Sequence, residues 1–230
     1  MRHLAGVAML LATAAAGAPT ASEPRASARV REAAAVFHEV MEIKDRTIPQ
    51  ELLDRAECVG IVPGLKKGAF LVGANYGKGI ITCRPENGEG WTAPSTVRVE
   101  GGSFGFQLGG SSTDLVMLIM SRRGADKLLH QSRFTVGADA SAAVGPVGRT
   151  AAAQTDAQMY SDILSWSRAR GLFAGVSLAG STLRQDASDN EAIYGKPITP
   201  QQILENGEPA TAAGQELIEM LSKYSSRRKG

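Results

Sequence analysis

The sequence has few of the side chains from which metal and catalytic sites are usually built. Its 230 residues include two cysteines, Cys58 and Cys83, and three histidines. The cysteines do not form a C-x-x-C pair and no histidine lies near either one in sequence, so a zinc site is not indicated. The formal net charge of +2 is too small to indicate nucleic-acid binding. We therefore expect no metal, no cofactor and no nucleic-acid partner.

Long apolar runs are also scarce, and the one that is present lies at the start of the chain. It covers residues 4–18, follows the positive Arg2 and is succeeded by small residues up to Ala21. This layout is typical of a secretory signal peptide, and the run is shorter than the roughly 18–20 residues that span a bilayer. An uncleaved anchor is the alternative. We expect residues 1–21 to be a cleavable signal and the protein to be exported, either periplasmic or secreted.

A lipid anchor is not expected on the exported chain. A lipoprotein signal needs a cysteine directly after its small-residue site, and the first cysteine here is Cys58. The protein is therefore predicted to be released without lipidation, so any membrane contact must come from its folded domain. The two cysteines leave two alternatives open. An oxidising compartment permits a disulfide, and two buried thiols are equally acceptable because cysteine packs well in protein cores.

Hydrophobic spacing predicts helices at both ends of the domain and strands between them. Apolar residues recur at helical spacing at the start of the domain and again at its end, whereas the middle is apolar and β-branched in short runs. The predicted helices cover residues 29–45, a short stretch after Pro49, 124–130, a stretch that begins at Thr199-Pro200, and 214–224. About eight short strands are expected between residues 58 and 183.

Glycine is concentrated in the strand region, which bears on the shape of the sheet. Of the 26 glycines, two precede Gly60, and glycines inside strands mark bends, bulges or close backbone approach. Many bends favour a curved sheet or a closed barrel. The predicted fold is α+β: a strongly curved, mostly antiparallel, glycine-rich sheet or barrel with helices at both ends. One domain should span residues 29–224, after a flexible start at 22–28 and before a basic tail at 225–230.

Two local features of the strand region are predicted from turn residues. Asn75-Tyr76-Gly77-Lys78 is interpreted as the turn of a hairpin between strands at 69–74 and 79–83. Pro94 is expected to confine a strand at 91–100 to an edge of the sheet, because proline lacks the N–H that an interior strand needs.

The segment Gly101-Gly-Ser-Phe-Gly105 matches the G-x-S-x-G pattern of a nucleophilic serine. That motif requires a strand before Ser103, a helix after it and a histidine far downstream. The residues after Gly105 are poor helix formers, and His130, the one histidine downstream, follows too soon. A glycine-rich kinked strand is the simpler interpretation, and we expect no enzyme activity and no catalytic residue.

Lysines in predicted turns are the candidate binding residues. Lys66 and Lys67 follow Pro63-Gly64, and Lys78 lies at the predicted hairpin tip. If both turns lie at one end of the sheet, three ammonium groups face one surface, and each contributes about 1 kcal/mol of attraction to an anionic bilayer. Three ordinary solvated lysines are the interpretation that the sequence alone favours, because charged residues in loops are usually solvated.

The first predicted helix is a second candidate for membrane contact. Phe37 and Met41 lie on its apolar face, and such a face can lie in a membrane interface. The helix has no tryptophan and little net positive charge, so packing of this face on the domain's own core is the favoured interpretation.

A series of short motifs gives the sequence a family resemblance. In chain order these are PGLKKGAF at 63–70, GKG at 77–79, WTAP at 91–94, GGSFGFQ at 101–107, TDLV at 113–116, GAD at 137–139, GPVGR at 145–149, SWSR at 165–168, GLFAGVSL at 171–178 and YG at 194–195. Together they closely resemble the SYLF domain family, over about residues 30–207.

The resemblance implies a binding function. Members of the family are associated with membrane lipids, which are phosphoinositides in eukaryotes, and with actin organisation when joined to SH3 or FYVE modules. Bacterial members are exported and have no established enzyme activity, and actin is not expected as a partner in a bacterial envelope. The resemblance therefore implies a non-enzymatic domain of the bacterial envelope that binds anionic phospholipids or phosphoinositide-type lipids. The alternative is a structural or protein-interaction module of the periplasm without a lipid ligand.

Overall fold

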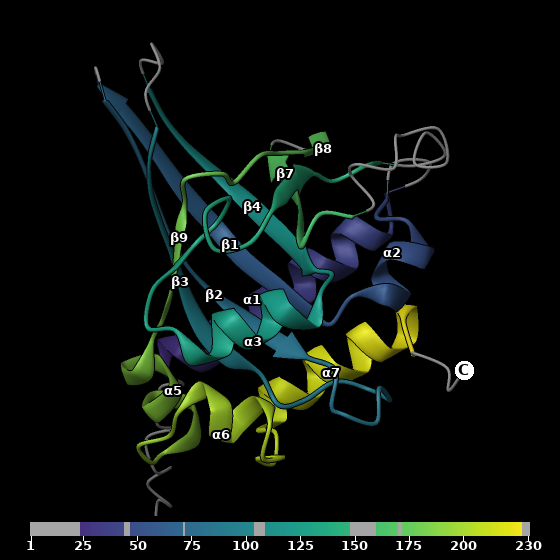
Figure 1. Ribbon diagram of the computed structural model, residues 1–230. Coiled ribbons are helices and arrows are strands. Elements are labelled where there is room, and N and C mark those ends of the chain that lie inside the picture. The colour runs from purple at the N-terminus through teal and green to yellow at the C-terminus, as the bar shows by residue number, and fades with distance from the viewer. Residues whose placement is uncertain are drawn as a thin grey trace, which may run out of the picture.

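The structure, a computed structural model, describes residues 24–43, 47–70, 72–103, 109–147, 160–169 and 172–226. The predicted signal at 1–21 and most of the predicted tail lie outside these residues. Four long strands form the middle of the domain and shorter strands extend it (Figure 1). The strands are β1 (Cys58–Phe70), β2 (Val72–Cys83), β3 (Ser95–Ser103), β4 (Gly109–Ile119), β5 (Phe134–Thr135), β6 (Ala142–Val144), β7 (Ile163–Ala169), β8 (Leu172–Gly175) and β9 (Thr182–Gln185).

Helices flank the sheet at both ends of the chain and also follow β4. They are α1 (Arg25–Met41), α2 (Gln50–Arg55), α3 (Arg122–His130), α5 (Ala187–Tyr194), α6 (Pro200–Leu204) and α7 (Ala212–Tyr224). The predicted start at Thr199-Pro200 is confirmed by a capping box, in which the Thr199 side chain accepts from the Gln202 N–H. Helix α1 begins four residues before the predicted position, and α5 was not predicted.

The sheet is curved and almost entirely antiparallel. Its strand order is β5-β9-β3-β2-β1-β4-β7-β6, with β8 also paired to β7. The pairing of β6 with β7 is parallel, and the other pairings are antiparallel. The sheet curls into a half-barrel, in which the two end strands β5 and β6 are not paired with each other across the described residues. The predicted α+β class and the strongly curved sheet are confirmed, in the open form rather than the closed one.

Each face of the sheet carries its own hydrophobic core, because successive strand residues point to opposite faces. On one face, here called the α1 face, Val59 and Ile61 pack with Val30 and Phe37 of α1 and with Leu217 of α7. Phe37 is fully buried there. The apolar side of the first helix is thus occupied by the domain's own core, as the favoured interpretation held, and a membrane-lying role for it is not supported.

The opposite face, here called the α3 face, is covered by α3 and α6. Val62 and Leu65 of β1 pack there with Leu128 of α3 and Ile203 of α6. In Figure 1, α3 crosses in front of the strands and α1 lies behind them. Burying a side chain of this size contributes about 1.5–3 kcal/mol, so the two cores together hold helices on both sides of the central strands.

Strand β1 is longer than the helix that covers it. Its 13 residues span roughly 40 Å at a rise of about 3.3 Å per residue. The 17 residues of α1 span roughly 26 Å at about 1.5 Å per residue. One end of the sheet therefore projects beyond the helices, at the upper left of Figure 1.

The predicted hairpin turn at Asn75–Lys78 is wrong. Strand β2 runs without interruption through these residues, and the connection between β1 and β2 lies between Phe70 and Val72. The glycines that suggested a turn serve close packing instead. A Cβ at Gly77 would lie 2.7 Å from Cγ1 of Val62, so any larger residue would collide with the neighbouring strand.

Two further local predictions also need correction. Pro63-Gly64 was expected to be a turn, but it lies within β1, where the register with β4 shifts between Val62 and Leu65 as in a β-bulge. Strand β3 was expected at an edge because of Pro94, but it lies between β2 and β9. Since Pro94 precedes the first residue of β3, its missing N–H removes no bond from the ladder.

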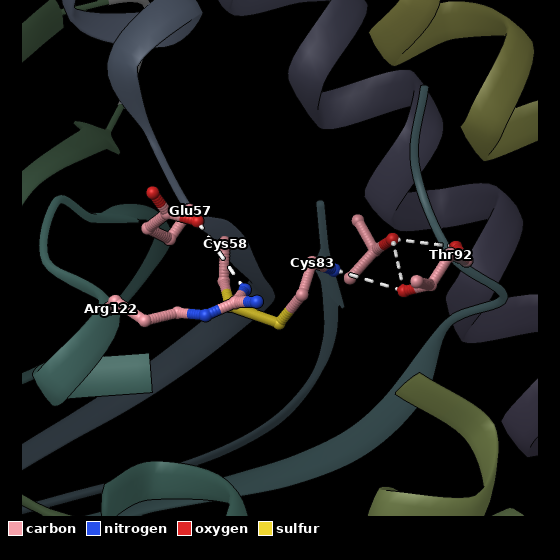
Figure 2. Close-up of a disulfide and its surroundings, with 6 residues drawn as sticks. Glu57, Cys58, Cys83, Thr92 and Arg122 are labelled. Carbon is pink, nitrogen blue, oxygen red and sulfur yellow. Dashed lines mark hydrogen bonds and ion pairs between the residues drawn. A yellow bond between two sulfur atoms is a disulfide. The ribbon is translucent and has the colours of Figure 1, made fainter. Parts of the chain in front are cut away.

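A disulfide joins Cys58 and Cys83 at the start of β1 and the end of β2. The two residues are direct partners in the antiparallel register, and both side chains are buried. Figure 2 shows the ion pair of Glu57 with Arg122 on one side of the bond, and Thr92, which accepts from the Cys83 N–H at 3.1 Å, on the other. Of the two alternatives, a disulfide or two buried thiols, the structure contains the disulfide.

Removal of the disulfide should lower stability without changing the fold. We expect the Cys58→Ala/Cys83→Ala variant to lose about 2–4 kcal/mol of the free energy of unfolding, because the bond constrains a loop in the unfolded chain. Urea titration followed by circular dichroism measures the loss, with reduced wild-type protein as the control. Detection of two reactive thiols in denatured, unreduced protein would contradict the disulfide itself.

Candidate functional site

The candidate lysines of β1 lie near the end of the sheet that projects beyond the helices. This hairpin end is the end at which β1 continues into β2 and β3 into β4, since Ala69 pairs with Gly109 and Gly73 with Ser103. Lys66 is exposed and Lys67 is partly buried. The structure therefore brings these two predicted site residues to the hairpin end.

Lys66 and Lys67 point to opposite faces of the sheet, because they are consecutive residues of one strand. Lys66 is paired with Tyr76 of β2, and Lys67 with Asn75. Lys67 shares the α3 face with Leu65, which is buried in that core. Lys66 therefore lies on the α1 face, beyond the reach of α1. Three ammonium groups were expected to face one surface if both turns lay at one end of the sheet, but Lys66 and Lys67 lie on opposite faces.

Lys66 and Lys67 share one electrostatic feature. Among the described residues, no carboxylate lies within ion-pair distance of either ammonium group. Tyr76, opposite Lys66, is 45 % exposed, so an aromatic ring with a hydroxyl accompanies the ammonium group on the α1 face. The hairpin end thus combines two uncompensated positive charges with an amphipathic aromatic side chain.

Lys78 lies in a different position from the predicted one and is paired with carboxylates. It lies inside β2, not at a hairpin tip, and its ammonium forms ion pairs with Asp186 at 2.8 Å and Asp189 at 3.1 Å. Asp189 also pairs with Arg29 of α1, and Arg98 of β3 lies 3.6 Å from Asp186. Lys78 therefore connects the sheet to α5 and, through Asp189, to α1.

The titration of this cluster reflects its ion pairs. Burial alone would raise the pKa of Asp186, but hydrogen bonds from Lys78 and Ser188 and the charges of Lys78 and Arg98 hold that pKa below its ordinary value. Burial would likewise lower the pKa of Lys78, but its hydrogen bonds with Asp186 and Asp189 raise it above 10.5. Both shifts favour the charged pair in the folded protein.

Cations farther along the α1 face are also compensated. Lys78, Arg98 and Arg184 are direct neighbours across β2, β3 and β9. Glu100 lies 3.2 Å from Arg184 and 3.9 Å from Arg98, so this row of cations is interleaved with carboxylates. The row stabilises the sheet more than it attracts an external anion.

Two hollows in the described surface, away from Lys66 and Lys67, are less suited to an anionic ligand. One, with a volume of about 520 Å³, lies beside the disulfide and is lined by Arg84 and Arg122 but also by Glu86, Asp126 and Glu205. The other, of about 340 Å³, lies between α1 and the bulge of β1, where Glu32, Glu39 and Asp114 outnumber Arg168. Neither hollow offers a net positive charge.

Sequence reasoning missed two polar residues of the hairpin end. Asn75 was assigned to a turn and Thr113 to a family motif, but they lie in adjoining positions of the α3 face on either side of β1. Each carries a buried oxygen that has no hydrogen-bond partner among the described residues. One signal could have identified Thr113. Strand alternation along β4 predicts a core residue at this position, and threonine is polar.

Other classes of site receive no support from the described residues. No cluster of three or more histidine, cysteine, aspartate or glutamate side chains there is placed to hold a metal ion. None of the described helices is long and apolar enough to cross a bilayer. After Ser103, the chain forms strand β4 from Gly109 onwards, whereas a nucleophile elbow would continue into a helix.

These features define an α+β domain built on a half-barrel sheet. The match to known proteins specifies it further: the chain belongs to the SYLF, or Ysc84, family, described as "Ysc84: Las17-binding protein actin regulator", which matches residues 100–224. The resemblance seen in the short motifs is thereby confirmed.

Two relatives show how much of the chain is shared. SH3 domain-containing YSC84-like protein 1 of Homo sapiens is 31 % identical over 202 residues, which are 86 % of this chain and 58 % of that protein. Protein YSC84 of Saccharomyces cerevisiae is 32 % identical over 179 residues, which are 77 % of this chain and 38 % of that protein. The chain thus spans little more than half of the human relative and less than half of the yeast one.

Replacement of Lys78 should destabilise the fold, because Asp186 would stay buried without its ammonium partner. For Lys78→Met we expect the free energy of unfolding to fall by roughly 1–3 kcal/mol, less than the loss for a fully buried pair. Urea titration measures the change. Lys66→Met, which removes an uncompensated exposed lysine, is the matched control and should leave stability unchanged.

The same variant should also flatten the dependence of stability on acid. Because the pKa of Asp186 is lower in the folded protein than in the unfolded chain, its stabilisation is complete above the unfolded pKa of about 3.9 and is lost as the pH falls below it. Wild type should therefore lose more stability than Lys78→Met between about pH 5 and pH 3. Equal losses of stability in the two proteins would show that the ion pair of Lys78 with Asp186 does not cause the acid dependence.

Proposed function

We propose that this chain is a non-enzymatic domain that binds anionic phospholipid surfaces through the hairpin end of its sheet. The observation that carries the proposal is the pair Lys66 and Lys67, which lies at the projecting end of β1 without an acidic partner among the described residues. Lys78, the third lysine expected to bind lipid, is assigned a structural role instead because both of its partners are carboxylates.

The physical strength of such binding is modest and dependent on salt. Each lysine near an anionic surface contributes about 1 kcal/mol, and the attraction falls within a Debye length of about 8–10 Å. Tyr76 supports the same orientation, because tyrosine places an apolar ring and a hydroxyl at the boundary between membrane and water. Two charges and one ring fit weak, reversible contact rather than permanent anchoring.

We also propose that the protein acts in a bacterial envelope after export. The disulfide between Cys58 and Cys83 supports this proposal, because such bonds persist in oxidising compartments and are rare in the cytosol. The sequence of residues 1–21 supports it independently through its signal-peptide layout.

A protein partner is the second candidate function, and the family description favours it. That description names Las17 binding and actin regulation, and the name of the human relative includes an SH3 domain. In an envelope protein the corresponding partner would be another envelope protein rather than actin, and the hairpin end is the surface available for it.

Vesicle flotation tests the lipid proposal. We expect wild type to float with vesicles containing phosphatidylglycerol at low salt and not with phosphatidylcholine alone. Lys66→Ala/Lys67→Ala should reduce the bound fraction, since about 2 kcal/mol of attraction corresponds to roughly a thirtyfold change in affinity.

The matched control removes two adjacent cations at the other end of the sheet. Arg122→Ala/Arg123→Ala changes the net charge by the same amount but alters residues at the start of α3. Equal loss of flotation in both double variants would assign binding to net charge alone. If wild type does not float with either vesicle but captures an envelope protein in the absence of lipid, the protein-partner function would be favoured.

A further inference from the structure

Two buried oxygens on the α3 face of the hairpin end lack a hydrogen-bond partner. They are Asn75 Oδ1 and Thr113 Oγ1, and neither is paired within the described part of the chain. Thr113 as a whole is 8 % exposed. An unsatisfied buried polar atom costs about 1–3 kcal/mol, so each of these two atoms requires an explanation.

The strand register places the residues that carry these oxygens next to Lys67. Asn75 is the direct partner of Lys67 across β1 and β2, and Thr113 is the direct partner of Leu65 across β1 and β4. Residues 65 and 67 share a face, so Lys67 and Thr113 are diagonal neighbours. Direct partners have Cβ atoms about 4.5–5.5 Å apart and diagonal ones about 7–8 Å. Lys67, Asn75 and Thr113 therefore form one cluster, here called the inner cluster.

The surroundings of Asn75 are built to accommodate its amide. Gly101 of β3 is its direct partner, and a Cβ at Gly101 would lie 2.5 Å from Asn75 Oδ1. A side chain there would displace the amide, so glycine leaves the space that it occupies. On the same side, the Asn75 amide nitrogen donates to Ser181 Oγ at 3.4 Å, and Ser181 is buried.

The inner cluster stands directly on the hydrophobic core. Leu65 is 1 % exposed and belongs to the α3-face core together with Val62. Along β1 the α3 face thus changes from apolar to polar within two residues. A ligand at the inner cluster would have an apolar floor and polar groups around it, an arrangement typical of small-molecule sites.

The donors and acceptors of the inner cluster specify the chemistry of its ligand. A carboxamide oxygen such as Asn75 Oδ1 can only accept, so the ligand must donate, as a hydroxyl does. The Thr113 hydroxyl can donate or accept, and the Lys67 ammonium requires a negative group and can only donate. A phosphate attached to a polyol meets all of these requirements in one molecule.

We propose that Lys67, Asn75 and Thr113 form a binding subsite for a phosphorylated polyol, the chemistry shared by glycerol phosphate and by the headgroup of a glycerophospholipid. Binding of a lipid headgroup at this subsite rests on the proposed membrane function. Binding of soluble glycerol phosphate at the same residues does not rest on it.

Calorimetric titration with sn-glycerol 3-phosphate tests the subsite without a membrane. We expect Thr113→Val to weaken binding about tenfold, because one hydrogen bond to the ligand is lost. The same variant should keep or raise the free energy of unfolding, because the hydroxyl has no partner in the described protein. Lys67→Met should weaken binding at least as much.

Ser112→Ala is the matched control, because it removes a hydroxyl from the neighbouring residue on the opposite, exposed face. It should bind sn-glycerol 3-phosphate as wild type does. Wild-type protein that gives no binding signal, or Thr113→Val that binds as tightly as wild type, would overturn the subsite. Inorganic phosphate that binds as tightly as sn-glycerol 3-phosphate would overturn its recognition of the polyol.

Vesicles of equal charge test whether the subsite recognises the hydroxyls of a lipid headgroup or only its negative charge. Phosphatidylglycerol carries headgroup hydroxyls, whereas phosphatidylmethanol carries the same single charge and no hydroxyl. We expect wild type to prefer phosphatidylglycerol about tenfold, which corresponds to about one hydrogen bond. Thr113→Val should show a smaller preference, because it loses one hydroxyl contact and keeps the Asn75 oxygen as an acceptor.

The two proposals fail in different ways. Binding of sn-glycerol 3-phosphate without flotation on either vesicle would support the subsite and overturn the membrane function. Flotation that is equal on both vesicles, for wild type and for Thr113→Val alike, would support the membrane function and overturn the subsite.

Discussion

Strand β1 is hydrogen-bonded along both of its edges, to β2 on one side and to β4 on the other. Because both edges are used, β1 can meet other parts of the protein or a ligand only through its two faces. Near the disulfide both faces are covered by helices, α1 on one side and α3 on the other. Farther along, the strand continues past the end of α1 toward the hairpin end, where Lys66, Lys67, Asn75 and Tyr76 lie. The surplus length of the paired strands thus creates the surface that we propose for binding.

A lysine in this sheet takes its role from its partners rather than from its residue type. Lys78 and Lys66 lie on the same face of neighbouring strands, but Lys78 meets two carboxylates from the start of α5. Lys66 lies beyond α5 and has no such partner among the described residues. A paired and partly buried lysine stabilises the fold, whereas an unpaired exposed one retains its charge for an external anion.

The sequence predicts the architecture of this domain better than its local turns. Helical spacing identifies α1 and α7, and the concentration of glycine after Gly60 correctly indicates a strongly curved sheet. The same glycines mislead at Gly77, because a glycine that permits a turn and a glycine that permits close packing look identical in sequence. Only the neighbouring strand, with Val62 in contact, distinguishes them. The error then moved Lys78 from the middle of β2 to a hairpin tip.

The candidate site could be predicted only in part for a related reason. The adjacency of Lys66 and Lys67 is visible in the sequence, but their separation onto opposite faces follows from their being in a strand and not a turn. The inner cluster depends on register: Asn75 and Thr113 are 38 positions apart and become neighbours of Lys67 only when β2 and β4 pair with β1. Such a cluster cannot be inferred from spacing along the chain.

The inner cluster also shows how stability and binding oppose one another in this sheet. A valine at position 113 would continue the apolar α3 face from Leu65 and leave no unsatisfied hydroxyl, so the fold alone does not favour threonine. Asn75 likewise occupies space that Gly101 provides at the expense of a side chain in β3. Polar groups that weaken the core at the point where it meets solvent are difficult to explain by folding and straightforward to explain by a ligand, because a bound hydroxyl supplies the hydrogen bond that the protein leaves unmade.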